Sequence, residues 1–432
     1  MSILFVDNFR GFTNTFIPLK QNNFFLGDNS TGKTSIITLI YLLSKSTFGL
    51  QNSIESISNS YNSYFDFASK KANKDYFRVG FFFELDANSK CYYLLTYKND
   101  NGMVSLSRLD YYFNKCEVNI LFSPKTIRYK SELRPNLSNP ISRINNAIKL
   151  DKQGNKNYKL ISKKRESGLF SNRIFLLSYI NEKNQKRFKG YLNQKSDTLV
   201  VSLLKAIQPF FMYGPIRSEP HKTYDNYVFE FSNEGKHAPL ILRKIFSESK
   251  SKKRFLEFLN AFAINSKLFD SIDIKDYDKI HLTSPFSIDI IYNGMKLNID
   301  SVGYGVSQCL PMLVDLYLGS DSAWYAMQQP EIHLHPKAQA ALGDLFYKLS
   351  MEEDKKFLIE THSDYIVDRF RLNFRKKKTK KPSSQVLFFE RTNRGNKITP
   401  IEIKQNGDYA SNQPKKFREF FIKEELKLLG IK

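Results

Sequence analysis

Cysteine is scarce in this sequence, and its scarcity removes whole classes of protein from consideration. Only Cys91, Cys116 and Cys309 occur among 432 residues. An odd number of scattered cysteines excludes a disulfide framework and gives no cysteine metal site. Such usage is typical of proteins in the reduced cytoplasm.

Long apolar runs are also missing. No stretch of about 18 apolar residues occurs, so no membrane span is expected. The first residues, MSILFVDNFRGF, lack the charged start and the small-residue cleavage site of a signal peptide. No apolar heptad pattern persists over about three repeats, so a long coiled-coil arm is not expected. We therefore expect a soluble cytoplasmic protein with no membrane partner.

Acidic residues are outnumbered. The chain has 66 Lys and Arg against 43 Asp and Glu, which gives a net charge of +23. Such a surface attracts nucleic acid or another polyanion. Lys is abundant throughout the chain, however, so the positive charge can also reflect the general amino-acid composition instead of a binding surface. Nucleic acid and an acidic protein partner both stay open. A hydrophobic content of 41% supports a globular chain, and the length indicates two or three lobes.

The segment Phe24–Ser35 (FFLGDNSTGKTS) is the most specific feature of the sequence. A short apolar strand leads into a loop that fits G-x-x-x-x-G-K-[ST], and an apolar helix follows. Glycines let backbone N–H groups approach phosphates, and the helix start adds partial positive charge. Lys33 is expected on the β- and γ-phosphates and the Thr34 hydroxyl on Mg²⁺. The expected nucleotide-binding residues of this loop are Gly27, Asp28, Asn29, Ser30, Thr31, Gly32, Lys33, Thr34 and Ser35.

The remaining periodicity predicts strands first and alternating helices and strands later. Strands are expected within 3–19, and over 77–85, 91–98, 104–113, 284–292, 295–299, 323–327, 356–360 and 386–403. Helices are expected over 199–211, 239–269, 309–318 and 415–429, and after Pro336 and Asp364. Residues 51–75 are polar with weak helical character, and 133–172 are expected to be a loop-rich insertion. The basic run 371–381 is either a solvated loop or a polyanion contact.

Two arginines occupy tight segments. Arg10 lies in the turn NFRGF ahead of the glycine-rich loop, where it can reach a nucleotide or form an ordinary surface turn. Arg217 lies in GPIRSEP, and the flanking prolines hold it at the end of a strand. A rigid connector with Arg217 in a salt bridge is the plainer interpretation. Neither segment is decisive alone.

Later segments place polar residues where strands end or helices begin. DSVGYGVSQ precedes an apolar helix, which is either an anion-binding start or a plain cap. His333 and His335 have no acidic or cysteine partner at metal-site spacing, so a metal site is disfavoured. His362 follows a strand, at the edge where open α/β sheets contact ligands.

The segments GDNSTGKT, DSVGYGVSQ, QQPEIHLHP and ETHSD, in that order, resemble the ABC-type ATPase heads of the RecF and OLD group. NFRGF, GPIRSEP and the region of Gly407 are also similar to that branch, many of whose members act in bacterial anti-phage systems such as the Septu, retron and PARIS types. The resemblance covers 1–50 and 210–432 well and 51–200 weakly. It implies an α/β P-loop NTPase fold with a mixed sheet, an antiparallel β lobe and an α-helical, loop-rich insertion.

The same resemblance assigns roles to individual residues. Gly303, Gly305, Ser307 and Gln308 match the signature loop, which contacts ATP held by a second subunit, so hydrolysis would need a head-to-head dimer. His362 matches the switch histidine that senses the γ-phosphate, and Arg10 matches an arginine placed over the nucleotide. The implied cofactors are ATP and Mg²⁺. No acidic Toprim nuclease domain follows, which implies that an effector would be a separate protein.

One position departs from the family pattern. Gln328 stands where the family has an acid that holds Mg²⁺, and Gln329 stands where a general base often sits. An amide carries no negative charge and cannot take a proton from water. Glu331 and Glu360 are nearby carboxylates that can partly substitute. Either the head hydrolyses ATP slowly by nature, or the chain carries Glu→Gln at 328, which would trap the ATP-bound state.

The sequence therefore predicts an ATP-driven dimerising switch that controls a partner effector, a nuclease or toxin, in anti-phage defence. We expect 1–50 to hold the P-loop lobe, 51–200 the β lobe and insertion, and 201–432 the remainder of the head. The alternative is a RecF-like DNA clamp in repair. A direct nuclease is disfavoured because 51–200 contains no clustered acidic metal site.

Overall fold

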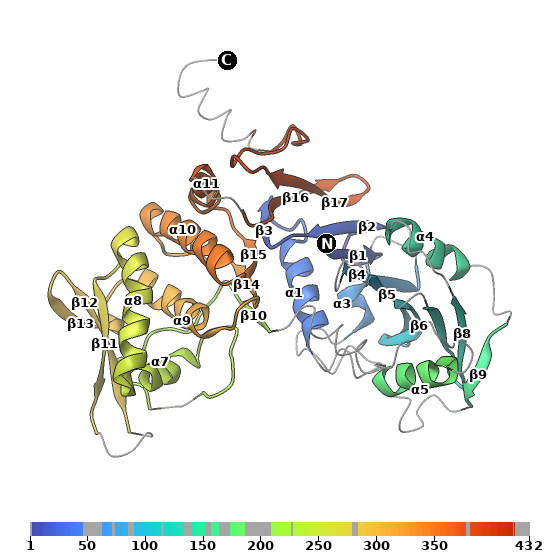
Figure 1. Cartoon of the computed structure of the whole chain (residues 1–432), viewed down its shortest axis with the longest axis horizontal. Coiled ribbons are helices and arrows are strands. Elements are labelled where there is room, and N and C mark those ends of the chain that lie inside the picture. Colours follow the sequence, from blue (N-terminus) through green and yellow to red (C-terminus); the bar gives the residue numbers. More distant parts are fainter. Residues whose placement is uncertain are drawn as a thin grey trace. The chain divides into compact units, whose positions relative to one another are not determined.

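The computed structural model describes residues 2–45, 63–70, 74–84, 90–113, 116–133, 140–151, 157–163, 173–185, 209–225, 228–278, 284–376, 381–417 and 419. Figure 1 traces the chain from blue to red. The chain forms two compact units. The first comprises Met1–Lys20, Asp28–Gln208 and Phe389–Pro400, and the second comprises Gln21–Gly27, Pro209–Phe388 and Ile401–Lys432.

The first unit is built on an antiparallel sheet that has eight strands within the described residues, in the order β2-β1-β4-β5-β6-β7-β8-β9. Neighbouring strands from β4 onward are joined in chain order, as in a meander. The strands are β1 (Ser2–Asp7), β2 (Thr15–Leu19), β4 (Tyr76–Glu84), β5 (Lys90–Asp100), β6 (Met103–Phe113), β7 (Cys116–Phe122), β8 (Ile127–Leu133) and β9 (Lys159–Ser162). The helices are α1 (Lys33–Ser44), α3 (Tyr64–Phe67), α4 (Pro140–Asp151) and α5 (Arg173–Gln185).

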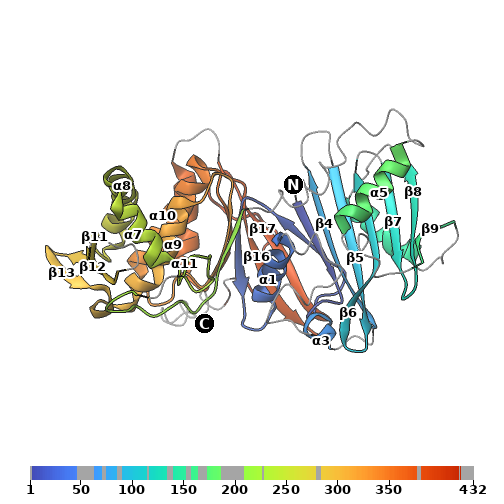
Figure 2. The ribbon, with the colours of Figure 1, turned by 90° about the horizontal axis from the view of Figure 1, so that it is seen from below.

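Helices α4 and α5 cover opposite faces of this sheet (Figures 1 and 2). Ile144 of α4 packs in a cluster with Leu94 of β5. Asn184 of α5 accepts a hydrogen bond of 2.8 Å from the hydroxyl of Ser131 in β8. Cross-strand pairing links Leu94 to Lys130 through β6 and β7, so these two residues lie on the same face of the sheet. Ser131 is the next residue along β8 and therefore lies on the opposite face. The sheet is therefore buried on both sides.

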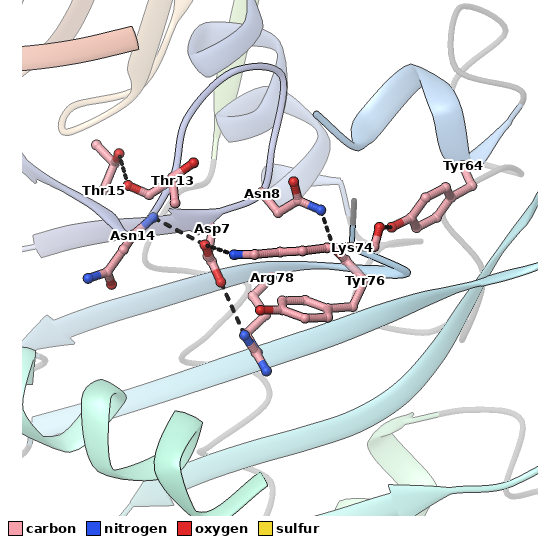
Figure 3. Close-up of polar contacts among 9 residues, drawn as sticks. All are labelled: Asp7, Asn8, Thr13, Asn14, Thr15, Tyr64, Lys74, Tyr76 and Arg78. Carbon is pink, nitrogen blue, oxygen red and sulfur yellow. Dashed lines mark hydrogen bonds and ion pairs between the residues drawn. The ribbon is translucent and has the colours of Figure 1, made fainter. Parts of the chain in front are cut away.

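The carboxylate of Asp7 anchors the connection between β1 and β2 (Figure 3). One oxygen accepts a hydrogen bond from the guanidinium of Arg78 at 3.1 Å. The other accepts from the backbone N–H of Asn14 at 3.2 Å and from Lys74 at 3.5 Å. The guanidinium of Arg78 also lies 4.0 Å from the ring centre of Tyr76. Because breaking such a buried pair leaves an unpaired charge, the residues between the two strands are held firmly at their base.

The second unit is built on a sheet in the order β10-β14-β15-β3-β16-β17. Its first four strands are parallel, and β16 and β17 continue from this unit into the first. Parallel strands covered on both faces are largely apolar, as the first four residues of β14 are. The strands are β10 (Phe210–Tyr213), β14 (Trp324–Gln328), β15 (Lys356–Glu360), β3 (Asn22–Gly27), β16 (Ser384–Thr392) and β17 (Gly395–Ile403).

Helices and a small antiparallel sheet complete the second unit. The helices are α7 (Ala238–Ser247), α8 (Ser249–Ser266), α9 (Tyr304–Leu318), α10 (Pro336–Glu352) and α11 (Asp364–Leu372), with the 3₁₀ turns η3 (Ile299–Ser301) and η4 (Asn373–Arg375). The small sheet is β11 (Ser271–Asp276), β12 (Phe286–Tyr292) and β13 (Met295–Asn298). Leu313 of α9 and Leu342 of α10 share one apolar core with Tyr325 and Phe357 of the parallel strands. None of the described helices combines the length and apolarity needed to cross a membrane.

A buried polar pair lies within that core. His237, which precedes α7, and Asp315 of α9 are joined at 2.9 Å, and the other ring nitrogen of His237 accepts from the backbone N–H of Ser232 at 3.1 Å. Burial lowers the pKa of His237 to about 4 and raises that of Asp315 to about 8. Both shifts favour the neutral forms, because charge is costly away from water.

The predicted α/β fold with an antiparallel β lobe is confirmed, and most expected strands are present. The loop-rich insertion expected over 133–172 contains α4 and β9 in its described part. Helix α9 begins at Tyr304, earlier than expected. Most of 51–75 and of the helices predicted over 199–211 and 415–429 lies outside the described residues, as does part of the basic run 371–381.

Candidate functional site

The loop between β3 and α1 has a backbone that requires glycine. Gly27 and Gly32 have φ of 132° and 95°, and Ser30 between them has φ of 61°. A Cβ on Gly32 would lie 2.6 Å from the ring of Phe12, which is too close for any side chain. Gly32 precedes the first turn of α1, and no acidic residue lies in that turn. The partial positive charge of the helix start is therefore not offset there.

Lys33 is the central cation of this loop. The residue is only 3% exposed, and its ammonium donates a hydrogen bond of 2.8 Å to the backbone carbonyl of Asp28. The hydroxyl of Thr31 donates to the same carbonyl at 2.7 Å. The loop thus curls around the ammonium, and Thr34 follows in the first turn of α1. This geometry suits an anion with several oxygens, because a buried cation lies at the start of a helix.

The turn with Arg10 is held against this loop. Arg10 and Gly11 have φ of 41° and 90°, and the flanking Phe9 and Phe12 exchange backbone hydrogen bonds of 3.0 and 2.7 Å. Two positive φ angles in succession define a tight primed hairpin turn. The side chain of Arg10 donates to the carbonyl of Asp66 at 2.5 Å. Phe12, which is fully buried, then packs on Gly32.

The parallel strands of the second unit end along one edge. Gln328 of β14 pairs in register with Glu360 of β15, which pairs with Phe25 of β3. The backbone N–H of Gln329 then donates to the carbonyl of Glu360 at 2.7 Å, and Gln329 has φ of 47°. Gln328 and Glu360 are 4% and 7% exposed. Among the described residues, the side-chain nitrogen of Gln328 has no hydrogen-bond partner.

Glu331 links the loops that follow β14 and β15. Its Oε1 accepts a hydrogen bond of 2.7 Å from the backbone N–H of His362. The hydroxyl of Ser363 accepts from the first turn of α11 and donates to Gln339 at 2.6 Å. The structure thus brings the sequence-predicted Gln328, Gln329, Glu331, Glu360 and His362 together at one edge. His335 caps α10 by accepting from the backbone N–H of Lys337, and no metal-binding group of three or more His, Cys, Asp or Glu occurs in the described part of the chain.

The segment predicted as a signature loop forms the start of α9. Gly303 precedes the helix, and Gly305 lies in its first turn. A Cβ on Gly305 would lie 2.7 Å from the carbonyl oxygen of His333, so this turn touches the loop after β14. Ser307 and Gln308 are buried. The Ser307 hydroxyl donates to the carbonyl of Tyr304, and the Gln308 amide donates to the carbonyl of Ser218 at 3.5 Å.

Sequence reasoning missed two features. The packing of Phe12 on Gly32 had no local signal, because the two residues are distant in the chain. The interpretation of Arg217 as one half of a salt bridge was wrong. Arg217 is 3% exposed, and none of its three nitrogens has a hydrogen-bond partner within the described ranges. Burial lowers its pKa, since a desolvated cation is disfavoured.

Comparison with known proteins places the chain in a family. The family described as AAA ATPase domain matches residues 1–367. None of the curated proteins matches. Among solved structures, the chain is similar to the Smc head domain of Pyrococcus furiosus, which has an extended coiled coil and is bound to the C-terminal domain of ScpA (12% identity, 99% of this chain, 100% of that chain, TM-score 0.42). It is also similar to the SMC head domain from Thermotoga maritima (10% identity, 93% and 98%, TM-score 0.40). The match over residues 1–367 shows that the chain belongs to the AAA ATPase domain family.

Proposed function

We propose that the chain binds and hydrolyses ATP as an ABC-type ATPase, and that it acts as a dimerising switch controlling a partner effector in anti-phage defence. The observation that carries the nucleotide part is the loop Gly27–Thr34, which combines positive φ angles with a buried ammonium and could therefore cradle an anion. Membership of the AAA ATPase domain family supports the same activity. The defence role rests on the resemblance of the motifs to the RecF and OLD group.

Each site residue has a proposed task. Backbone N–H groups from Asp28 to Ser35 would surround the phosphates, and Lys33 would neutralise the β- and γ-phosphates. Arg10 would contact the nucleotide from the turn packed on Gly32. The signature residues Gly303, Gly305, Ser307 and Gln308 would contact ATP held by a second copy of this chain, and His362 would respond to the γ-phosphate.

The donor set for Mg²⁺ is neutral. The hydroxyl of Thr34 and the side-chain oxygen of Gln328 are the groups that would hold the ion, and a bound Mg²⁺ would offset phosphate charge. The carbonyl and amino groups of a glutamine side chain are interchangeable by rotation, so the unpartnered nitrogen of Gln328 marks a position that its oxygen can also occupy. Uncharged oxygen ligands bind Mg²⁺ more weakly than carboxylates do. Glu331, three residues after Gln328, and Glu360, the register partner of Gln328, are carboxylates that could support the site.

ATP-dependent self-association tests the proposal directly. The purified chain is sized with and without Mg²⁺–ATP, and binding is measured with a fluorescent ATP analogue. We expect a dimer or larger oligomer only with ATP, and its loss in Lys33→Ala. Lys45→Ala, at the other end of α1 with its ammonium over Tyr41, is the matched control and should behave as the original chain. A chain that ignores millimolar ATP would refute the proposal.

A DNA clamp is the second candidate, favoured by the net charge of +23. A clamp should bind duplex DNA with an affinity that falls steeply with salt, because bound counterions are released. A switch that controls an effector should instead co-purify with a protein encoded beside it. Binding to DNA that persists at high salt would count against both a clamp and simple charge attraction.

A further inference from the structure

The second unit contains an arginine and a glutamate whose side chains have buried polar atoms without hydrogen-bond partners. The three guanidinium nitrogens of Arg217 and Oε2 of Glu331 have no hydrogen-bond partner among the described residues. Burial lowers the pKa of Arg217, and the Cys309 thiol and the Glu331 carboxylate are the neighbours that oppose the shift. A buried charge without hydrogen bonds is costly. Such a group therefore calls for an explanation other than stability.

The segment with Arg217 is fixed to the start of α9. The backbone N–H of Gly214 donates to Asn233 at 3.1 Å, and that of Ser218 donates to Glu234 at 2.9 Å. On the other side, the amide of Gln308 reaches the carbonyl of Ser218. The guanidinium therefore projects from a clamped turn that is tied to the first turns of α9.

Glu331 is fixed to the other loops of the same edge. Its Oε1 holds the backbone N–H of His362 at 2.7 Å, and its own carbonyl accepts from Leu334 at 3.0 Å. The first turn of α9 touches this loop where Gly305 meets the carbonyl of His333. Oε2 of Glu331 is therefore an acceptor without a hydrogen-bond partner among the described residues, on a loop that touches the same helix as the Arg217 segment.

We propose that Arg217 is a positioning residue whose guanidinium pairs with Oε2 of Glu331 in a second arrangement of the head, so that a shift of α9 is passed to the His362 loop. Arginine suits this task because its planar fork can grip a carboxylate with two hydrogen bonds. The inference rests on the proposed function. It names the link between the surface that meets a second copy and the residue that responds to the γ-phosphate.

A double-mutant cycle tests the pair. Arg217→Gln, Glu331→Gln and the double variant are compared for the ATP concentration that drives self-association. Gln at 331 keeps the acceptor for His362 and removes only the charge. We expect each single substitution to raise that concentration by about tenfold, within the usual range of coupling between sites. The double variant should be no worse than either single one, because each removes the same pair. Losses that multiply would overturn the proposal.

Thermal stability separates positioning from a structural role. Arg217→Gln should leave the melting temperature unchanged or raise it, because it removes an unpartnered buried charge. Arg243→Gln is the matched control, since Arg243 is also buried but is bonded to Asp276 at 2.7 Å and to the carbonyl of Ser284 at 2.8 Å. It should lower the melting temperature and leave the ATP response of the folded protein intact. If Arg217→Gln is destabilised and responds normally to ATP, the inference is rejected and the proposed function is not affected. If the original chain does not respond to ATP, both the inference and the proposed function are rejected.

Discussion

The loop Gly27–Thr34 and the strand end at Gln328–Gln329 both follow buried parallel strands, yet they differ in charge. The loop contains an ammonium, Lys33, that is nearly fully buried and held by the loop itself. The strand end contains two amides, which accept hydrogen bonds but carry no negative charge. Under the proposed function, the chain retains its groups for holding a triphosphate, while its groups for activating water are neutral. Binding and turnover should therefore respond very differently to substitution.

Gly32→Ala should break the binding half of this comparison. A Cβ there meets the ring of Phe12 at 2.6 Å in a backbone of φ 95°, so the loop and the Arg10 turn must separate. We expect ATP affinity to fall by about a hundredfold, as when an electrostatic cradle loses its geometry, and unfolding free energy to fall by about 3 kcal/mol. Titration with a fluorescent ATP analogue and thermal melts measure both.

Gly102→Ala is the control for that substitution. Gly102 has a similar φ of 88°, but apart from its chain neighbours no atom of the described residues lies within 4 Å of its Cβ position. It should show only the cost of the backbone angle, about 1 kcal/mol, and normal ATP affinity. If both variants bind ATP as the original chain does, the packing of Phe12 on Gly32 has no part in the site.

Gln328→Glu should sharpen the turnover half. A carboxylate at this position can hold Mg²⁺ and orient water, so we expect ATP turnover to rise by about tenfold or more, the lower end of what an acid–base group contributes. Burial opposes ionisation of the new carboxylate, and the gain should therefore grow as the pH rises. Phosphate release measured against pH checks this.

Gln385→Glu introduces the same buried acid elsewhere in the second unit. Gln385 is 1% exposed and donates to Asn23 at 2.8 Å. This control should lose stability without any rise in turnover per folded molecule. An unchanged rate in Gln328→Glu would reject the view that Gln328 limits hydrolysis, whether the glutamine is natural or substituted.

The parts of the site that sequence reasoning could predict are those set by contiguous residues. The loop around Lys33 follows from local glycine spacing, and the edge formed by Gln328 and Glu360 follows from the rule that parallel strands end together. The contact between Phe12 and Gly32 depends on how a hairpin folds back, which no local pattern encodes. The state of Arg217 likewise depends on the packing of three separate segments.

The fold shows the same division. Strands β4 to β6 have long aromatic and β-branched runs and were predicted, whereas α4 was missed. Its apolar residues Ile144 and Ala147 have helical spacing, but the polar residues around them hide the pattern. The apolar residues of this helix are buried against a sheet face that is formed by strands distant in the sequence, so the helix could not be recognised from its own residues.

Asp315→Asn has the smallest expected effect. It tests how strongly the second unit disfavours buried negative charge, because an amide at position 328 avoids the cost of burying a carboxylate. Burial raises the pKa of Asp315 from 3.8 to about 8, so the folded chain keeps a proton that the unfolded chain releases. The stability this proton contributes is complete at low pH and is lost as the pH rises through about 8. Asparagine cannot ionise and still accepts a hydrogen bond from His237, whose own lowered pKa acts in both proteins and cancels in their difference. The melting temperature of Asp315→Asn, relative to that of the original chain, should therefore rise as the pH increases from about 4 to about 8. The relative rise should be at least about 3 °C, the shift that roughly 1 kcal/mol produces. If the difference in melting temperature does not change across this pH range, Asp315 is ionised in the folded chain. The core would then tolerate a buried anion, and the cost of burying charge would not explain the amide at Gln328.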